Sequence, residues 1–147
     1  MPSATMQTTI DRSADEVWHR VGTFEDMSWY PGIETCRLEG DLRIATMRGG
    51  LEADELLVEH DDGARTYTYA VRAFRGQTRF DLGGGRTLDL ASMANHHRAR
   101  MTVVPVDASS CRVTYELELD EGHDETFALT SGQYQSVIEH LKRLVEG

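Results

Sequence analysis

The last segment of the chain, residues 124–145, most constrains the fold, because its apolar side chains have the spacing of one long helix. They recur every three or four residues, which predicts an amphipathic helix with a single apolar stripe. The stripe consists of Phe127, Tyr134, Val137, Ile138, Leu141, Leu144 and Val145. Gly132 could mark a kink, a close-packing point or room for a ligand, and we favour close packing. Such a helix must bury its stripe against another element.

Seven segments earlier in the chain are rich in β-branched and aromatic residues, and several alternate between apolar and polar side chains. We predict strands at residues 5–11, 34–39, 42–48, 51–60, 65–74, 97–106 and 112–120. Turns rich in glycine and aspartate separate several neighbours, so adjacent strands are expected to pair antiparallel in a meander. Tyr67, Tyr69 and Val71 alternate with threonine and arginine, which predicts one face covered by the closing helix and one in water.

A helix is also expected directly after the first strand. Ser13 and Glu16 form a capping box, in which each side chain satisfies a free backbone amide of the first turn. The helix should therefore begin at Ala14 and end near Gly22.

A second short helix should follow the first. Asp26 can cap it, and Pro31 forbids its continuation. The residues in between include three with large side chains, Met27, Trp29 and Tyr30. We expect this aromatic turn to lie beside a cavity for an apolar ligand.

Length and charge exclude several classes of protein. The chain of 147 residues is expected to form one domain, residues 1–147. Its formal net charge of −10 opposes binding to nucleic acid and to anionic membrane surfaces, and no apolar run is long enough to insert into a membrane as a helix. The N-terminus lacks a basic region followed by an apolar stretch, so we expect a cytoplasmic protein in which Cys36 and Cys111 are free thiols.

Residues 75–95 depart from a tight hairpin. Apolar residues alternate with polar ones on both sides of a triple glycine at 83–85, which predicts an inserted hairpin-like arm. This arm could extend strands five and six, fold over the mouth of a pocket, or form the contact of a homodimer.

The order of these elements resembles the helix-grip fold of the START/SRPBCC superfamily, the birch-pollen-allergen-like fold. Residues 8–40, 54–71 and 96–119 look like its polyketide cyclase/dehydrase-like branch. The resemblance implies an α+β protein with a seven-stranded curved antiparallel sheet wrapped around the long C-terminal helix, and two short helices after strand one. It also implies a deep cavity between sheet and helix that takes lipids, sterols, polyketides or other apolar molecules.

The resemblance further implies residues of the pocket. Trp29 and Pro31 match the family's aromatic-proline turn, and Arg43 matches a strand-three arginine. Glu55 matches a strand-four carboxylate, and Tyr69 a strand-five tyrosine. Alternation and helical spacing direct further tyrosines inward. The candidate ligand-binding residues are Trp29, Tyr30, Arg43, Tyr67, Tyr115 and Tyr134.

Glu55, His97 and Tyr69 are the candidates for catalysis. An inward Glu55 could serve as base or acid, could form an ion pair with Arg43, or could simply be solvated. His97 could shuttle protons or only hydrogen-bond in the cavity wall, and tyrosine hydroxyls could polarise a carbonyl. The six histidines include no metal-ligand spacing, so we expect no metal, and acid–base chemistry without a cofactor.

Two functions would use the same cavity. The first is a polyketide cyclase, aromatase or dehydratase acting on an apolar, poly-carbonyl small molecule, in which Glu55, His97 and the tyrosines move protons and Arg43 orients an oxygen. The alternative is a non-catalytic carrier or sequestering protein for a lipid-like or polyketide metabolite. A more distant third is a partner-binding module, similar to chaperone-associated relatives, that would use the exterior and the arm.

Overall fold

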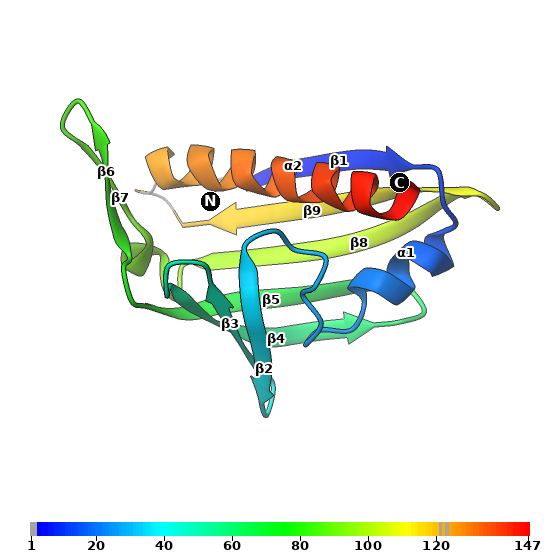
Figure 1. The fold of residues 1–147 in the computed structure, drawn as a ribbon, viewed down its shortest axis with the longest axis horizontal. Coiled ribbons are helices and arrows are strands. Elements are labelled where there is room, and N and C mark those ends of the chain that lie inside the picture. The colour runs from blue at the N-terminus through cyan, green and yellow to red at the C-terminus, as the bar shows by residue number, and fades with distance from the viewer. Residues whose placement is uncertain (1–2, 121, 123) are drawn as a thin grey trace.

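The computed structural model describes residues 3–120, 122 and 124–147, which form a curved antiparallel sheet and a long helix beside it (Figure 1). The sheet has seven strands in the order β1-β9-β8-β5-β4-β3-β2. They are β1 (Ser3–Ile10), β2 (Ile33–Glu39), β3 (Leu42–Met47), β4 (Glu52–Asp61), β5 (Thr66–Arg75), β8 (His97–Asp107) and β9 (Ser110–Leu119). The closing helix is α2 (Asp124–Glu146). The predicted strands and the predicted closing helix are confirmed.

The register of the central strands decides which side chains meet under α2. Tyr69 of β5 lies opposite Ala99 of β8, and Met101 of β8 lies opposite Tyr115 of β9. Because side chains of a strand alternate between faces, this register sets the buried tyrosines on one inner surface. The stripe of α2 packs on that surface through Tyr134, Val137, Ile138 and Leu141.

The first helix, α1 (Ala14–Val21), begins at the predicted residue. Of the predicted capping box only the Ser13 half is formed, because the Glu16 carboxylate contacts the Ser13 hydroxyl at 3.4 Å. The Ser13 hydroxyl accepts a hydrogen bond from the backbone N–H of Glu16 at 3.2 Å, which satisfies one of the free amides at a helix start. Val17 and Val21 are buried in the main core. The helix is therefore fixed at its start by the cap and along one face by packing.

The expected second short helix is not formed, and the described residues 23–32 make two turns instead. The N–H of Asp26 donates to the carbonyl of Thr23, and that of Tyr30 to the carbonyl of Met27. The Asp26 carboxylate does accept from the N–H of Ser28 at 2.9 Å. Five residues before a proline are too few to repay helix nucleation, and burial of the aromatic side chains sets the backbone path.

The arm is a separate two-stranded sheet of β6 (Arg79–Gly83) and β7 (Arg86–Asp89), followed by a short 3₁₀ helix, η1 (Leu90–Met93). It projects from the end of the main sheet (Figure 1) and does not lengthen it, since β5 pairs directly with β8. Its base returns to the protein body, where Met93 is buried.

Gly132 of α2 is exposed, and a Cβ added there would meet no atom within 4 Å. The expectation of close packing at this glycine is therefore wrong. In the described part of the chain, no helix has both the length and the apolar character needed to cross a membrane.

Candidate functional site

A cavity of about 90 Å³ lies between α2 and the inner face of the sheet. Most of its wall is apolar and comes from β3, β4, the turn between them, β5 and η1, through Met47, Leu51, Ala53, Val71, Phe74, Leu90 and Met93. The rest is polar and comes from the aromatic turn, β4, β8 and α2, through Tyr30, Glu55, His97, Thr130, Gln133 and Tyr134. This cavity is the candidate site.

A buried ion pair stands at the polar side of the cavity. Arg43 lies opposite Glu55 in the register of β3 and β4, and its Nε donates to Glu55 Oε1 at 2.8 Å. Its Nη2 lies 2.7 Å from the same oxygen, at an angle that makes no hydrogen bond. Its Nη1 donates to the backbone carbonyl of Phe24 at 2.8 Å, and its guanidinium carbon lies 4.1 Å from the centre of the Phe24 ring. The carboxylate is therefore held in place, and the two charges offset each other.

Four side chains from four elements form a continuous hydrogen-bonded chain. His97 Nε2 lies 2.9 Å from the Tyr134 hydroxyl, which lies 3.1 Å from the Tyr69 hydroxyl, and Tyr69 in turn is bonded to Tyr115. The rings of Tyr115 and Tyr134 stack with their centres 4.1 Å apart. The other imidazole nitrogen, His97 Nδ1, is buried and has no hydrogen-bond partner among the described residues.

Burial keeps these groups uncharged. It lowers the pKa of His97 to about 4, because desolvation disfavours the imidazolium. It raises the pKa of Tyr69, Tyr115 and Tyr134 well above the usual value, because desolvation disfavours the phenolate. At neutral pH these four side chains are joined by polarised hydrogen bonds and carry no net charge.

The predicted site residues fall into three groups. Tyr30, Glu55, His97 and Tyr134 line the cavity. Arg43, Tyr69 and Tyr115 lie behind that wall and contact it through the bonds described above. Trp29 and Tyr67 are buried away from it: the Trp29 indole donates to the carbonyl of Asp26, and Tyr67 packs against Trp18 and Phe24.

Sequence reasoning missed several residues of the wall. Leu90 and Met93 reach the cavity because η1 folds the base of the arm inward, and the pattern of the arm did not predict where its base returns. Gln133 donates from its Nε2 to the Tyr30 hydroxyl at 3.3 Å, and its place beside Tyr134 on α2 was the only signal for it. Within the described residues, no group of three metal-ligating side chains could hold a metal ion.

Comparisons with known proteins agree with this architecture. Residues 1–146 match the family described as polyketide cyclase / dehydrase and lipid transport. An uncharacterized protein from Bacillus thuringiensis superposes with a TM-score of 0.78 at 18% identity, covering 99% of this chain and 100% of that one. A START superfamily protein from Mycobacterium smegmatis gives 0.71 at 12% identity, with 98% and 97% covered.

A two-domain protein has the same fold in part of its length. The di-domain ARO/CYC BexL, from the BE-7585A biosynthetic pathway, superposes with a TM-score of 0.73 at 18% identity, covering 99% of this chain and 47% of BexL. No curated protein matches the chain. On the match over residues 1–146, the chain belongs to the polyketide cyclase / dehydrase and lipid transport family.

Proposed function

We propose that the protein binds a small apolar molecule bearing carbonyl groups in the cavity under α2 and catalyses its cyclisation or dehydration. The observation that carries this proposal is that a fixed carboxylate, Glu55, and the polarised hydroxyl of Tyr134 face one small cavity whose wall is mostly apolar. The family description and the ARO/CYC neighbour support the reaction class.

In the proposed reaction, Glu55 is the proton acceptor. Both short contacts of Arg43 are to Oε1, so Oε2 is the oxygen left to take a proton from the carbon beside a substrate carbonyl. In a cyclisation, the resulting enolate carbon attacks a second carbonyl carbon of the same molecule and forms a C–C bond. The alkoxide left by this attack takes the proton from Glu55 and becomes a hydroxyl. Glu55 then removes the second proton from the same carbon and passes it to the hydroxyl as the C–O bond breaks, so water leaves and the carboxylate is regenerated.

Tyr134 stabilises the negative charge that develops on the carbonyl oxygen. If the Tyr134 hydroxyl donates its hydrogen bond to the substrate oxygen, its own oxygen can accept hydrogen bonds from the Tyr69 hydroxyl and from an Nε2–H of His97. That tautomer leaves His97 Nδ1 without a proton, in agreement with its lack of an acceptor among the described residues. The donors Tyr115, Tyr69 and Tyr134 then polarise one another toward the oxyanion.

The size of the cavity limits what enters without movement. A volume of about 90 Å³ holds roughly three water molecules, so a larger substrate must displace part of the wall. Met47 on β3 and Met93 on η1 are the wall side chains best suited to such a change, since methionine adapts readily to new shapes.

A small β-hydroxyketone, 4-hydroxy-4-methylpentan-2-one, tests the chemistry. Its dehydration to the conjugated enone removes one proton beside the carbonyl and one hydroxyl, and the enone is followed by its ultraviolet absorbance. We expect turnover by the wild type, loss of at least 100-fold in Glu55→Gln, and loss of about 10- to 100-fold in Tyr134→Phe. Tyr115→Phe is the matched control, because Tyr115 lies at the far end of the hydrogen-bonded side chains from His97. It should lose less activity than Tyr134→Phe. Equal rates in the wild type and Glu55→Gln, with both folded, would rule out this role of Glu55.

A carrier is the second candidate, and one observation favours it. Glu55 is paired with Arg43, and the tyrosines bond to one another, so few polar groups are left to react. Native mass spectrometry of freshly purified protein separates the two functions. A stoichiometric apolar molecule that is held equally by the wild type and Glu55→Gln and released only on unfolding, with no turnover of carbonyl substrates, would support the carrier.

A further inference from the structure

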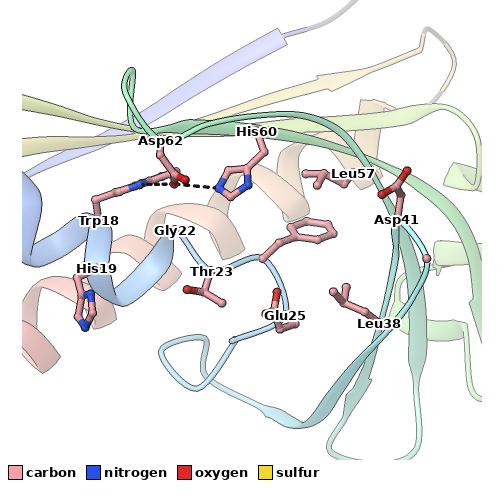
Figure 2. Close-up of a pocket in the computed structure, with 12 residues that line it drawn as sticks. Trp18, His19, Gly22, Thr23, Glu25, Leu38, Asp41, Leu57, His60 and Asp62 are labelled. Carbon is pink, nitrogen blue, oxygen red and sulfur yellow. Dashed lines mark hydrogen bonds and ion pairs between the residues drawn. The ribbon is translucent and has the colours of Figure 1, made fainter.

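A second hollow, which we call the outer groove, has a volume of about 370 Å³ and lies on the outside of the fold (Figure 2). Its walls are α1, the loop at residues 22–25, the turn between β2 and β3, and β4 with the turn that follows it. It shares no lining residue with the cavity under α2. It is therefore a separate place on the protein, not used in the reaction proposed above.

The floor of the outer groove is apolar and fixed. Phe24 is part of its lining and is held in place, because the Arg43 guanidinium packs on its ring and donates to its backbone carbonyl. Leu57 and the indole of Trp18 flank it, and Leu38 is 43% exposed. A ligand with an apolar part would therefore find a preformed surface.

The rim of the outer groove is acidic. Glu25 and Asp41 lie on the side of Leu38, and Asp62 lies beside Trp18 and His60 (Figure 2). None of the described residues that line the groove is lysine or arginine. Asp62 Oδ1 accepts from the Trp18 indole at 3.0 Å and lies 3.3 Å from His60 Nε2. Glu25 and Asp41 form no ion pair with any described residue.

We propose that the outer groove binds an amphiphilic organic cation, an aryl- or alkyl-ammonium compound. Its apolar part would cover Phe24 and Leu57, and its ammonium group would lie between Glu25 and Asp41. A neutral or anionic ligand of the same shape would desolvate these carboxylates without compensation, whereas a cation gains charge complementarity. The net charge of −10 also attracts cations to the protein and so favours the same class of ligand.

Three compounds of one shape test the sign of the charge: 4-phenylbutylamine, 4-phenylbutanol and 4-phenylbutanoate. Each is titrated into the ¹⁵N-labelled protein at pH 8 and low salt while the two indole N–H resonances are followed by NMR. Trp18 reports on the outer groove, and Trp29, whose indole is bonded to the Asp26 carbonyl in the core, is the internal reference. We expect the amine to shift the Trp18 signal saturably, the alcohol to bind at least threefold more weakly, and the carboxylate to leave the signal unchanged.

Paired variants separate the groove from the general negative charge. Glu25→Gln with Asp41→Asn removes two rim charges and should weaken amine binding about three- to tenfold. Glu34→Gln with Glu139→Gln removes two exposed charges elsewhere on the molecule and should change the affinity less than twofold. Leu38→Ser should weaken the amine and the alcohol alike, because it acts on the apolar surface only.

Three results would overturn the proposal. Equal affinity for the amine and the alcohol would show that the charge of the ligand plays no part in binding. If both double variants weakened amine binding equally, the effect would come from the overall negative charge of the protein and not from the groove. A shift of the Met93 amide without a shift of Trp18 would place the amine in the cavity under α2. Turnover of the β-hydroxyketone should be unchanged in Glu25→Gln with Asp41→Asn, so failure here is distinct from failure of the proposed function.

Discussion

Arg43 and Glu55 are opposite charges inside the protein core, where they are 1% and 7% exposed. Removing one partner of such a pair leaves the other charge buried and uncompensated, so we expect Glu55→Gln to lower the free energy of unfolding by about 3 kcal/mol. Replacing both residues, as Arg43→Met with Glu55→Leu, should recover most of that loss. Urea unfolding of Arg43→Met, of Glu55→Leu and of the double variant gives the coupling energy. Three variants with additive effects would show that the pair is not coupled.

His97 gives the protein a predictable response to acid. Burial lowers its pKa from 6.5 to about 4, so the unfolded chain binds more protons than the folded one between these values. Stability from the neutral imidazole is therefore complete above about pH 6.5 and is lost as the pH falls toward 4, by at most about 3 kcal/mol. The isosteric His97→Gln variant should lack this part of the pH dependence. Unfolding curves of the two proteins at pH 7 and pH 4.5 measure it, and parallel losses would contradict it.

For single residues, the sequence predicts the face of the sheet on which a side chain lies better than it predicts whether that side chain reaches the cavity. Alternation along β5 directs Tyr67 and Tyr69 inward, and both are buried, yet only Tyr69 joins the hydrogen-bonded chain behind the cavity wall. Position along the strand relative to α2 makes this difference, and it depends on sheet curvature and register, which local patterns do not contain. Gln133 was missed for a related reason, since its place beside Tyr134 on α2 does not specify its contact with Tyr30.

Among the elements, α2 carries a correctable weakness at Gly132. Glycine costs a helix interior about 1 kcal/mol relative to alanine, and an added Cβ meets no atom within 4 Å. We expect Gly132→Ala to raise the free energy of unfolding by about 0.5–1 kcal/mol. Gly22→Ala at the end of α1 is the contrasting control, because its Cβ would come within 2.5 Å of the Trp18 ring and should destabilise. Urea unfolding of both variants decides this, and a loss in Gly132→Ala would reveal a need for glycine.

The elements that sequence predicts well are those whose pattern is set by burial over many residues. Several of the strands, such as β8 and β9, and the helix α2 repeat one periodicity along their length, so small local preferences add up. The expected second short helix rested on a cap and a terminating proline, Asp26 and Pro31, and these signals are equally compatible with two turns. In such a short segment, burial of Met27, Trp29 and Tyr30 outweighs helix propensity.

For the whole molecule, the order of elements was sufficient to predict the sheet and the covering helix. The arm was predicted as a hairpin, but its direction was not, because β6 and β7 pair only with each other in the described structure. What joins the arm to the body is η1, whose Met93 is 2% exposed although the sequence around it has no clear periodicity. Met93 is therefore the part of the cavity wall that the sequence pattern does not predict, because it is a buried residue within an irregular segment.

Because β6 and β7 pair only with each other in the described structure, we predict that the arm can be shortened without loss of the fold. Arg79 and Asp89 are paired across the hairpin, so residues 80–88 can be replaced by Asn-Gly, a two-residue turn that suits antiparallel strands. The hydrogen bond from the Leu90 N–H to the Thr78 carbonyl should survive and keep η1 in place. We expect unfolding to stay cooperative, with a change within about 1 kcal/mol, since a two-stranded sheet on its own has little stability. Denaturant unfolding measures this, and sedimentation of both proteins tests the arm as a dimer contact, because only a dimer held by β6 and β7 would dissociate when they are removed.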